Sequence, residues 1–130
     1  QNQSLALDLF EVCLFAVRGS EKDCPMGDLC RLFSLAFGIE LDERKLTECC
    51  ERVYSLERSF LCREGVTRRD DRLIGKWAEE PLPSGPYKGE TLDPQKWEAM
   101  LDDYYRLRGW DSRGVPTRGR LSELYIDGIE

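Results

Sequence analysis

Two side chains that could do chemistry, Asp8 and Cys13, stand five residues apart in the most hydrophobic stretch of this 130-residue chain, Leu5–Val17. A carboxylate accepts hydrogen bonds, and a thiolate is a soft metal ligand. A carboxylate in an apolar setting is costly unless a partner hydrogen-bonds to it. We therefore treat Asp8 and Cys13 as candidate binding residues. The alternative, which the residues alone favour, is that Cys13 is an ordinary core residue, as many reduced cysteines are.

The stretch predicts one helix from about Ser4 to Gly19, with Asp8 and Glu11 as the only charges of Leu5–Val17. A helix that is hydrophobic on every side is normally buried on every side, and at roughly 20 Å this one is too short to span a membrane. Because little upstream sequence is available to bury it, we expect part of the protein to lie outside this chain. On a continuous helix five residues correspond to about 140° of rotation. The two side chains would therefore face one ligand only if the helix ends or bends near Cys13.

Composition excludes several classes of function. The net charge of −6 argues against nucleic acid or an anionic membrane as partner, and no signal peptide or membrane-spanning run is visible. Histidine is absent, which excludes a histidine-based triad or general base. The six cysteines form no CxxC pair, so a zinc or iron–sulfur site built from this chain alone is not expected; a small zinc protein remains the weaker third hypothesis. Reduced core cysteines indicate a cytoplasmic compartment.

The rest of the chain alternates helical patterns with caps. We expect a helix from Cys24–Pro25 to Gly38, and a longer one that begins after Asp42 and ends near Cys62. Their apolar faces carry several of the cysteines, which we interpret as core residues; the two predicted stripes are Met26, Leu29, Cys30, Phe33, Ala36 and Phe37, and Leu46, Cys49, Cys50, Val53, Leu56 and Phe60.

Beyond the long helix the pattern breaks. A short helix could form over Leu73–Glu80, followed by a proline- and glycine-rich arm that should wrap the surface in an ordered way. Asp93 and Pro94 then open a helix that ends at Gly109, Trp110 anchors the next turn in the core, and Thr117 caps a last short helix. No segment alternates with period two. The predicted fold class is all-α: a bundle of about five to six helices with a long extended Pro/Gly-rich arm.

The charged segment 63–72 permits two interpretations. Its arginines could bind an anion, or they could form an ion-pair network that ties the long helix to the arm. Because both signs of charge alternate, the sequence favours the network.

Three further blocks make the sequence recognisable. LERSFLCREGVTRRDD resembles the pattern ER-x-F-N-x-REG-x-x-R-x-DD, EEPLPSGPYKG resembles EEPLP-x-GP-x-KG, and MLDDYYRLRGWDSRGVPT resembles ML-x-EYY-x-x-RGWD-x-x-GxPT. These patterns are those of the C-terminal part of the tungsten- or molybdenum-dependent aldehyde:ferredoxin oxidoreductase family. The resemblance covers nearly the whole chain, and identifies residues 1–130 as a C-terminal helical domain, a fragment of a longer protein.

The resemblance implies an enzyme that oxidises small aldehydes to carboxylic acids and passes the electrons to ferredoxin. In the family a metal held by two pterins does the chemistry, and a 4Fe–4S cluster relays electrons. The family motif D-x-x-G-L-C matches residues 8–13. The resemblance thus implies that Asp8 hydrogen-bonds a pterin and that Cys13 is the fourth cluster ligand. It also implies that the other ligands and the substrate-site residues lie upstream in the same polypeptide, so that the isolated domain is inactive and binds no cofactor.

One residue departs from the family motif and favours an alternative hypothesis about function. Glu11 stands in place of the glycine, where a small residue would let the backbone approach the cofactor; it adds bulk and negative charge. Leu61 likewise stands where the family often has asparagine. The alternative hypothesis is a stand-alone helical interaction or structural module that kept the fold and lost the cofactor. An apolar patch as large as the one around Asp8 and Cys13 should be exposed in the isolated domain or covered in a homo-oligomer.

Overall fold

The computed structural model describes residues 1–17, 26–126 and 128, and over these residues the fold is all-α, as predicted. The helices are α1 (Asn2–Leu9), α2 (Leu14–Val17), α3 (Met26–Phe37), α4 (Glu43–Arg63), the 3₁₀ helix η1 (Arg68–Asp71), α5 (Gly75–Glu79), α6 (Pro94–Arg108) and α7 (Arg118–Glu123). Strands are absent from this part of the chain, apart from an isolated bridge between Trp110 and Pro116. None of the described helices has the length and hydrophobicity needed to cross a bilayer.

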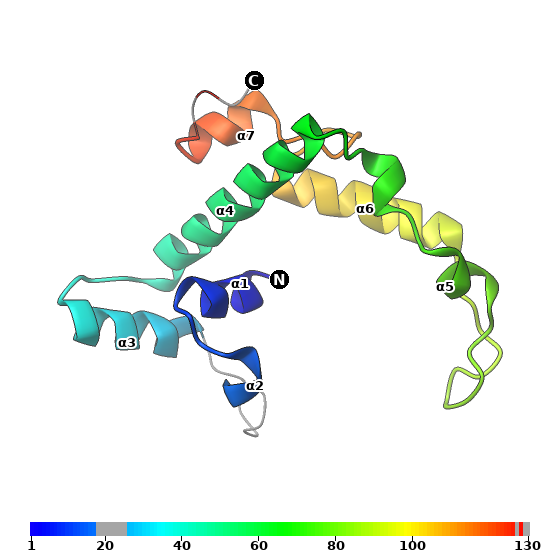
Figure 1. Ribbon diagram of the computed structural model, residues 1–130, viewed down its shortest axis with the longest axis horizontal. Coiled ribbons are helices and arrows are strands. Elements are labelled where there is room, and N and C mark those ends of the chain that lie inside the picture. The colour runs from blue at the N-terminus through cyan, green and yellow to red at the C-terminus, as the bar shows by residue number, and fades with distance from the viewer. Residues whose placement is uncertain (18–25, 127, 129–130) are drawn as a thin grey trace.

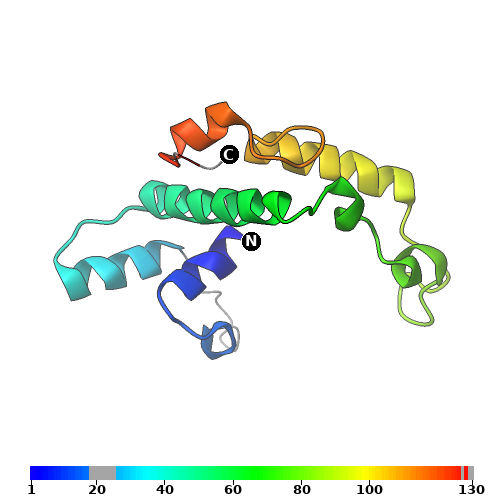
Figure 2. The same ribbon diagram turned by 45° about the horizontal axis from the view of Figure 1, so that its top comes forward.

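The long helix α4 is the centre of the fold (Figures 1 and 2). Its 21 residues begin where predicted, because the side chain of Asp42 caps it: Oδ1 accepts from the backbone N–H of Lys45 at 2.7 Å. Helices α1 and α3 lie on one side of α4, whereas α6 and α7 lie on the other. The predicted caps of α6 and α7 are also confirmed, since the side chains of Asp93 and Thr117 accept from the first turns of those helices.

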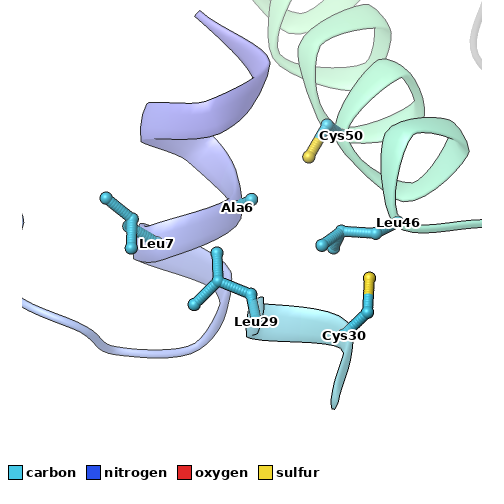
Figure 3. Packing of buried hydrophobic residues seen from close by; sticks show 6 residues of the cluster. All are labelled: Ala6, Leu7, Leu29, Cys30, Leu46 and Cys50. Carbon is cyan, nitrogen blue, oxygen red and sulfur yellow. The ribbon is translucent and has the colours of Figure 1, made fainter. Parts of the chain in front are cut away.

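The first core lies where α1, α3 and the start of α4 meet (Figure 3). It contains small and aliphatic side chains that are almost fully buried: Ala6, Leu7, Leu29, Cys30, Leu46 and Cys50. The prediction that Cys30 and Cys50 are core residues is confirmed. Burial of each leucine contributes about 1.5–3 kcal/mol to folding. This cluster fixes α1, and therefore the segment that carries Asp8, against α3 and α4.

A second cluster surrounds the buried guanidinium of Arg58 on the other half of α4. Arg58 donates to both carboxylate oxygens of Asp71 at 3.0 and 2.6 Å, and its Nε donates to the carbonyl of Gly114 at 2.7 Å. The hydroxyl of Tyr105 donates to the same carboxylate. Asp71 belongs to η1, so this pair ties α4 to the segment that leads into the arm. The ion-pair interpretation of segment 63–72 is thereby confirmed for Asp71.

The carboxylate of Glu51 joins the two halves of the molecule. Its Oε1 accepts from Arg108 of α6 at 2.6 Å and from the amide of Asn2 of α1 at 2.9 Å. Its Oε2 lies 3.5 Å from a guanidinium nitrogen of Arg120 in α7. Arg108 is buried and stacks over the ring of Tyr54 at 4.5 Å. One carboxylate of α4 therefore contacts α1, α6 and α7.

The prediction of one continuous helix from Ser4 to Gly19 is wrong over the described residues, because α1 ends at Leu9 and α2 starts only at Leu14. The turn is a Schellman motif. The backbone N–H of Val12 donates to the carbonyl of Leu7 at 2.9 Å, and that of Glu11 donates to the carbonyl of Asp8 at 3.0 Å. Glu11 supplies the left-handed residue of the motif, with φ of +56°. Residues 18–25, which include the predicted helix end and Cys24, lie outside the described residues.

Several residues that periodicity assigns to the core are exposed instead. Phe37 is 66% exposed, Phe60 52% and Leu56 48%. The arm also differs from expectation: residues 81–90 are all exposed, and the arm projects from the body (Figure 1). Two backbone hydrogen bonds close the arm into a loop. The N–H of Leu82 donates to the carbonyl of Glu90, and the N–H of Gly89 donates to the carbonyl of Leu82, each at 2.9 Å.

Replacing Glu11 by glycine should stabilise the chain by about 1 kcal/mol, because an L-residue with φ near +56° is strained and glycine is not. Denaturant unfolding of the two proteins measures this difference. Glu11→Ala is the matched control: it removes the same side-chain charge but keeps the strained Cβ, so it should gain little. Equal gains from the two substitutions would contradict the conformational explanation.

Replacing Asp71 by asparagine should destabilise the fold by about 3 kcal/mol at neutral pH, because it leaves the buried charge of Arg58 without its partner.

Burial acts to raise the pKa of the Asp71 carboxyl, but the hydrogen bonds from Arg58 and Tyr105 outweigh it and hold that pKa below the ordinary value of 3.8. A depressed folded pKa gives stability that is present above the unfolded pKa and is lost as the pH falls through the folded value. Unfolding free energies measured between pH 6 and pH 2 should therefore fall less steeply below about pH 4 in Asp71→Asn than in the parent. Parallel acid limbs would rule this linkage out.

Candidate functional site

Asp8 lies in the last turn of α1 with its side chain exposed. Its backbone carbonyl is engaged by the turn, but within the described residues no hydrogen bond or ion pair engages its carboxylate. Both oxygens are thus available as acceptors. The sequence predicted that this helix would carry the acid into an interior; within this chain the acid instead faces outward.

Cys13 stands just beyond the turn, immediately before α2, and is also exposed. In the described part of the chain its thiol has no partner either. The rotation of about 140° expected on a continuous helix does not apply, because α1 ends between the two residues. The condition set by the sequence, a helix that ends or bends near Cys13, is therefore met.

The turn between Asp8 and Cys13 is anchored to the core. Leu7 is 1% exposed, and half-buried Val12 packs against the same core cluster. This is the apolar contact that accompanies a Schellman motif. The ring of Phe10 lies 5.5 Å from that of Phe33 in α3. Backbone hydrogen bonds and packing thus fix the segment that presents the carboxylate and the thiol.

The donor set defines what this site can do. It offers one hydrogen-bond-accepting carboxylate and one metal-binding thiol, and no histidine exists in the chain. Among the described residues, no three metal-ligating side chains converge. A metal or cluster bound through Cys13 would therefore take its other ligands from another polypeptide segment.

The other described cysteines have different surroundings. Burial raises the pKa of the Cys30 thiol, with Glu43 and Asp42 adding to the effect, and burial likewise raises that of Cys50. Both thiols are therefore held in the protonated form, which neither attacks substrates nor binds metals. Cys62 is half-buried and lies 3.8 Å from the carbonyl of Gly114.

A groove of about 850 Å³ lies apart from this turn, where the end of α4, η1 and the 111–115 turn meet. Its lining includes Arg68, Arg69, Arg72 and Arg113. Arg68 is held by Glu98 and Asp102, each at 2.6 Å, and Arg113 by Asp111 at 3.2 Å. Neither Asp8 nor Cys13 lines this groove.

The role of Glu11 in the turn was not predicted from the sequence. We interpreted the glycine of the D-x-x-G-L-C pattern as a place for close backbone approach to a cofactor. The structure gives it a second reason, because the fourth position of the pattern needs a positive φ, which glycine adopts without strain. The signal was present in the family pattern and not in this chain: an apolar helix followed by glycine and then a hydrophobic residue is typical of a Schellman cap, but glutamate stands in place of that glycine here.

Known proteins match this arrangement along almost the whole chain. The sequence profile described as "Aldehyde ferredoxin oxidoreductase, domains 2 & 3" matches residues 1–126. A tungsten-containing aldehyde ferredoxin oxidoreductase of Pyrococcus furiosus is 34% identical over 127 residues, which cover 97% of this chain and 20% of the relative. That of Thermococcus kodakarensis is 32% identical with the same coverage. A WOR-like subunit of an aliphatic sulfonate oxidoreductase from Pyrococcus furiosus is 31% identical and covers 88% of this chain and 18% of the relative.

A solved structure shows the same fold. The active site complex BamBC of benzoyl coenzyme A reductase, in complex with 1,5-dienoyl-CoA, superposes with a TM-score of 0.63 at 25% identity, over 82% of this chain and 14% of that one. The chain spans about one fifth of the length of the first two relatives. With the profile matched from residue 1 to residue 126, this chain belongs to the aldehyde ferredoxin oxidoreductase family and corresponds to a C-terminal domain of such enzymes.

Proposed function

We propose that residues 1–130 form the C-terminal helical domain of an oxidoreductase that converts aldehydes to carboxylic acids with ferredoxin as electron acceptor. The observation that carries this proposal is the turn after α1, which presents an exposed carboxylate and an exposed thiol, both without partners in the described residues. In this proposal Asp8 binds a pterin of a tungsten or molybdenum bis-pterin cofactor, and Cys13 binds a 4Fe–4S cluster. The cofactor supplies the oxidation chemistry and the cluster the path for electrons.

The chemistry of the two side chains fits these groups. The carboxylate of Asp8 can accept hydrogen bonds from the amino and ring N–H groups of a pterin, which orients that ring. The thiolate of Cys13 is the ligand type that iron–sulfur clusters use. Because one cysteine supplies one ligand, the remaining ligands would come from the part of the protein outside this chain, which is why we expect the domain alone to be inactive. Free thiols also fit a reducing, cytoplasmic compartment.

Exposed apolar side chains support a larger assembly. Leu35 on α3 is 77% exposed, and Phe15 on α2 is 85% exposed. Three further apolar residues of α3 and its C-terminal flank are more than half exposed: Leu32, Phe37 and Ile39. Exposed apolar side chains gathered on neighbouring elements are often covered by a partner surface. Since the chain spans one fifth of its relatives, we propose that other domains of the same polypeptide cover it.

A stand-alone module that has lost the cofactor is the second candidate, favoured by Glu11 in the motif. The turn itself does not favour it, because Glu11 keeps the hydrogen bonds and the positive φ of the Schellman motif. The length of the natural reading frame separates the two: upstream cysteines with cluster-ligand spacing support the enzyme, and a start near Gln1 supports the module.

Cys13→Ser in the full-length protein should reduce the iron content and change the electron paramagnetic resonance spectrum of the reduced cluster, because a hydroxyl is a poor substitute for a thiolate. Asp8→Asn should weaken pterin retention about tenfold to a hundredfold, as expected for loss of a charged acceptor. Metal and pterin analysis after gel filtration measures both. Cys49→Ser is the matched control, since Cys49 is a half-buried cysteine of α4. Unchanged iron and spectra in Cys13→Ser would refute the ligand assignment.

Leu35→Gln should lower the unfolding free energy of the full-length protein by about 1–2 kcal/mol, because a leucine that is exposed in this domain would be buried by its neighbour. Arg31→Gln, a change at an exposed polar position of the same helix, is the control and should have little effect. Thermal and denaturant unfolding measure the difference. If Leu35→Gln is as neutral as the control, this face is not covered in the intact protein.

A further inference from the structure

The side chain of Glu11 has no role in the turn that it occupies. The turn uses only its backbone, through the N–H bond to the carbonyl of Asp8 and the positive φ. The side chain is exposed, and no ion pair or hydrogen bond neutralises its carboxylate within the described residues. A bare negative charge therefore stands between Asp8 and Cys13, in a position that strains the backbone.

We propose that the Glu11 carboxylate makes the iron–sulfur group bound through Cys13 harder to reduce, and so sets its potential below that of relatives with glycine at this position. This inference rests on the proposed function, in which Cys13 is a cluster ligand. It goes beyond that function by assigning a regulatory role to a residue that departs from the family motif.

The argument for proximity comes from the chain itself. Two residues along a chain separate Cα atoms by at most about 7 Å. The Glu11 carboxylate and a group on the Cys13 sulfur therefore lie within a distance comparable to the Debye length, which is about 10 Å at 0.1 M ionic strength. Screening at this range is incomplete.

The direction follows from charge. A one-electron reduction adds one negative charge to a group that its thiolate ligands already make anionic, and no proton needs to accompany it. The negative charge of Glu11 opposes that addition and so lowers the reduction potential. By the same balance, the reduced group gives its single electron more readily to an acceptor. Glycine at this position would build the same turn without this field.

The test is a potentiometric titration of the full-length protein, followed by the spectrum of the reduced cluster. Glu11→Gln, which removes the charge and keeps the size, should shift the midpoint potential to more positive values. Glu11→Gly should give a similar positive shift together with higher thermal stability, whereas Glu11→Asp should stay close to the parent. Glu90→Gln, an equivalent change in the distant arm, is the control and should leave the potential unchanged (Figure 1).

The outcomes separate this inference from the function on which it rests. A cluster that changes its spectrum in Cys13→Ser but keeps its potential in Glu11→Gln overturns the inference and leaves the proposed function standing. A protein without a cluster, or with a cluster that is insensitive to Cys13→Ser, overturns both. A shift in Glu11→Gly without one in Glu11→Gln would assign the effect to backbone strain and would also overturn the electrostatic inference.

Discussion

The arrangement of the helices depends most on the carboxylate of Glu51, because four helices meet at this group. It stands on α4 and accepts from Arg108 of α6 and Asn2 of α1, with Arg120 of α7 nearby. Helices α1 and α6 lie on different sides of α4 (Figure 2), and the bonds to Glu51 connect both of them to this helix. Such a pair is costly to desolvate, and removal of one partner leaves the other charge buried and unpaired. The position of α1, and with it of the candidate site, depends on this constraint.

The sequence was most informative where one side chain decides a local structure. Asp42 and the Asp93–Pro94 pair fix the starts of α4 and α6, and Gly109 fixes an end, because capping depends on neighbours in the chain. The break after Leu9 was missed for the opposite reason. Glutamate is a good helix former, and only the surrounding packing forces Glu11 into the left-handed region. Asp8 and Cys13 were predicted as candidate binding residues from their side-chain chemistry. Their exposure to solvent depends on the break in the helix and was not predicted.

Burial was predicted less well than secondary structure, and the cause is physical. An apolar stripe at helical spacing indicates that one face of a helix is covered, but it does not indicate which element or domain covers that face. On α4 the stripe divides: Leu46 and Cys50 are covered by α1 and α3, whereas Leu56 and Phe60 are about half exposed. On α3 the exposed Phe37 belongs to the same predicted stripe as buried Leu29. A chain that spans a fifth of its relatives carries the pattern of a larger core than it contains.

The turn after α1 separates two properties that a motif usually combines. Its geometry is set by backbone hydrogen bonds and by the packing of Val12 against the core cluster that contains Leu7, and these features are present with glutamate in place of glycine. The electrostatic field near the turn is set by the side chain, and this field changes when glutamate replaces glycine. A departure from a family pattern therefore need not mean loss of the site: here it costs about 1 kcal/mol of strain and retains the presentation of Asp8 and Cys13. Glutamate in place of glycine adds a negative charge beside Asp8 and Cys13 and leaves the backbone turn intact. In the proposed function, the charge of Glu11, rather than its size, is therefore the property to vary.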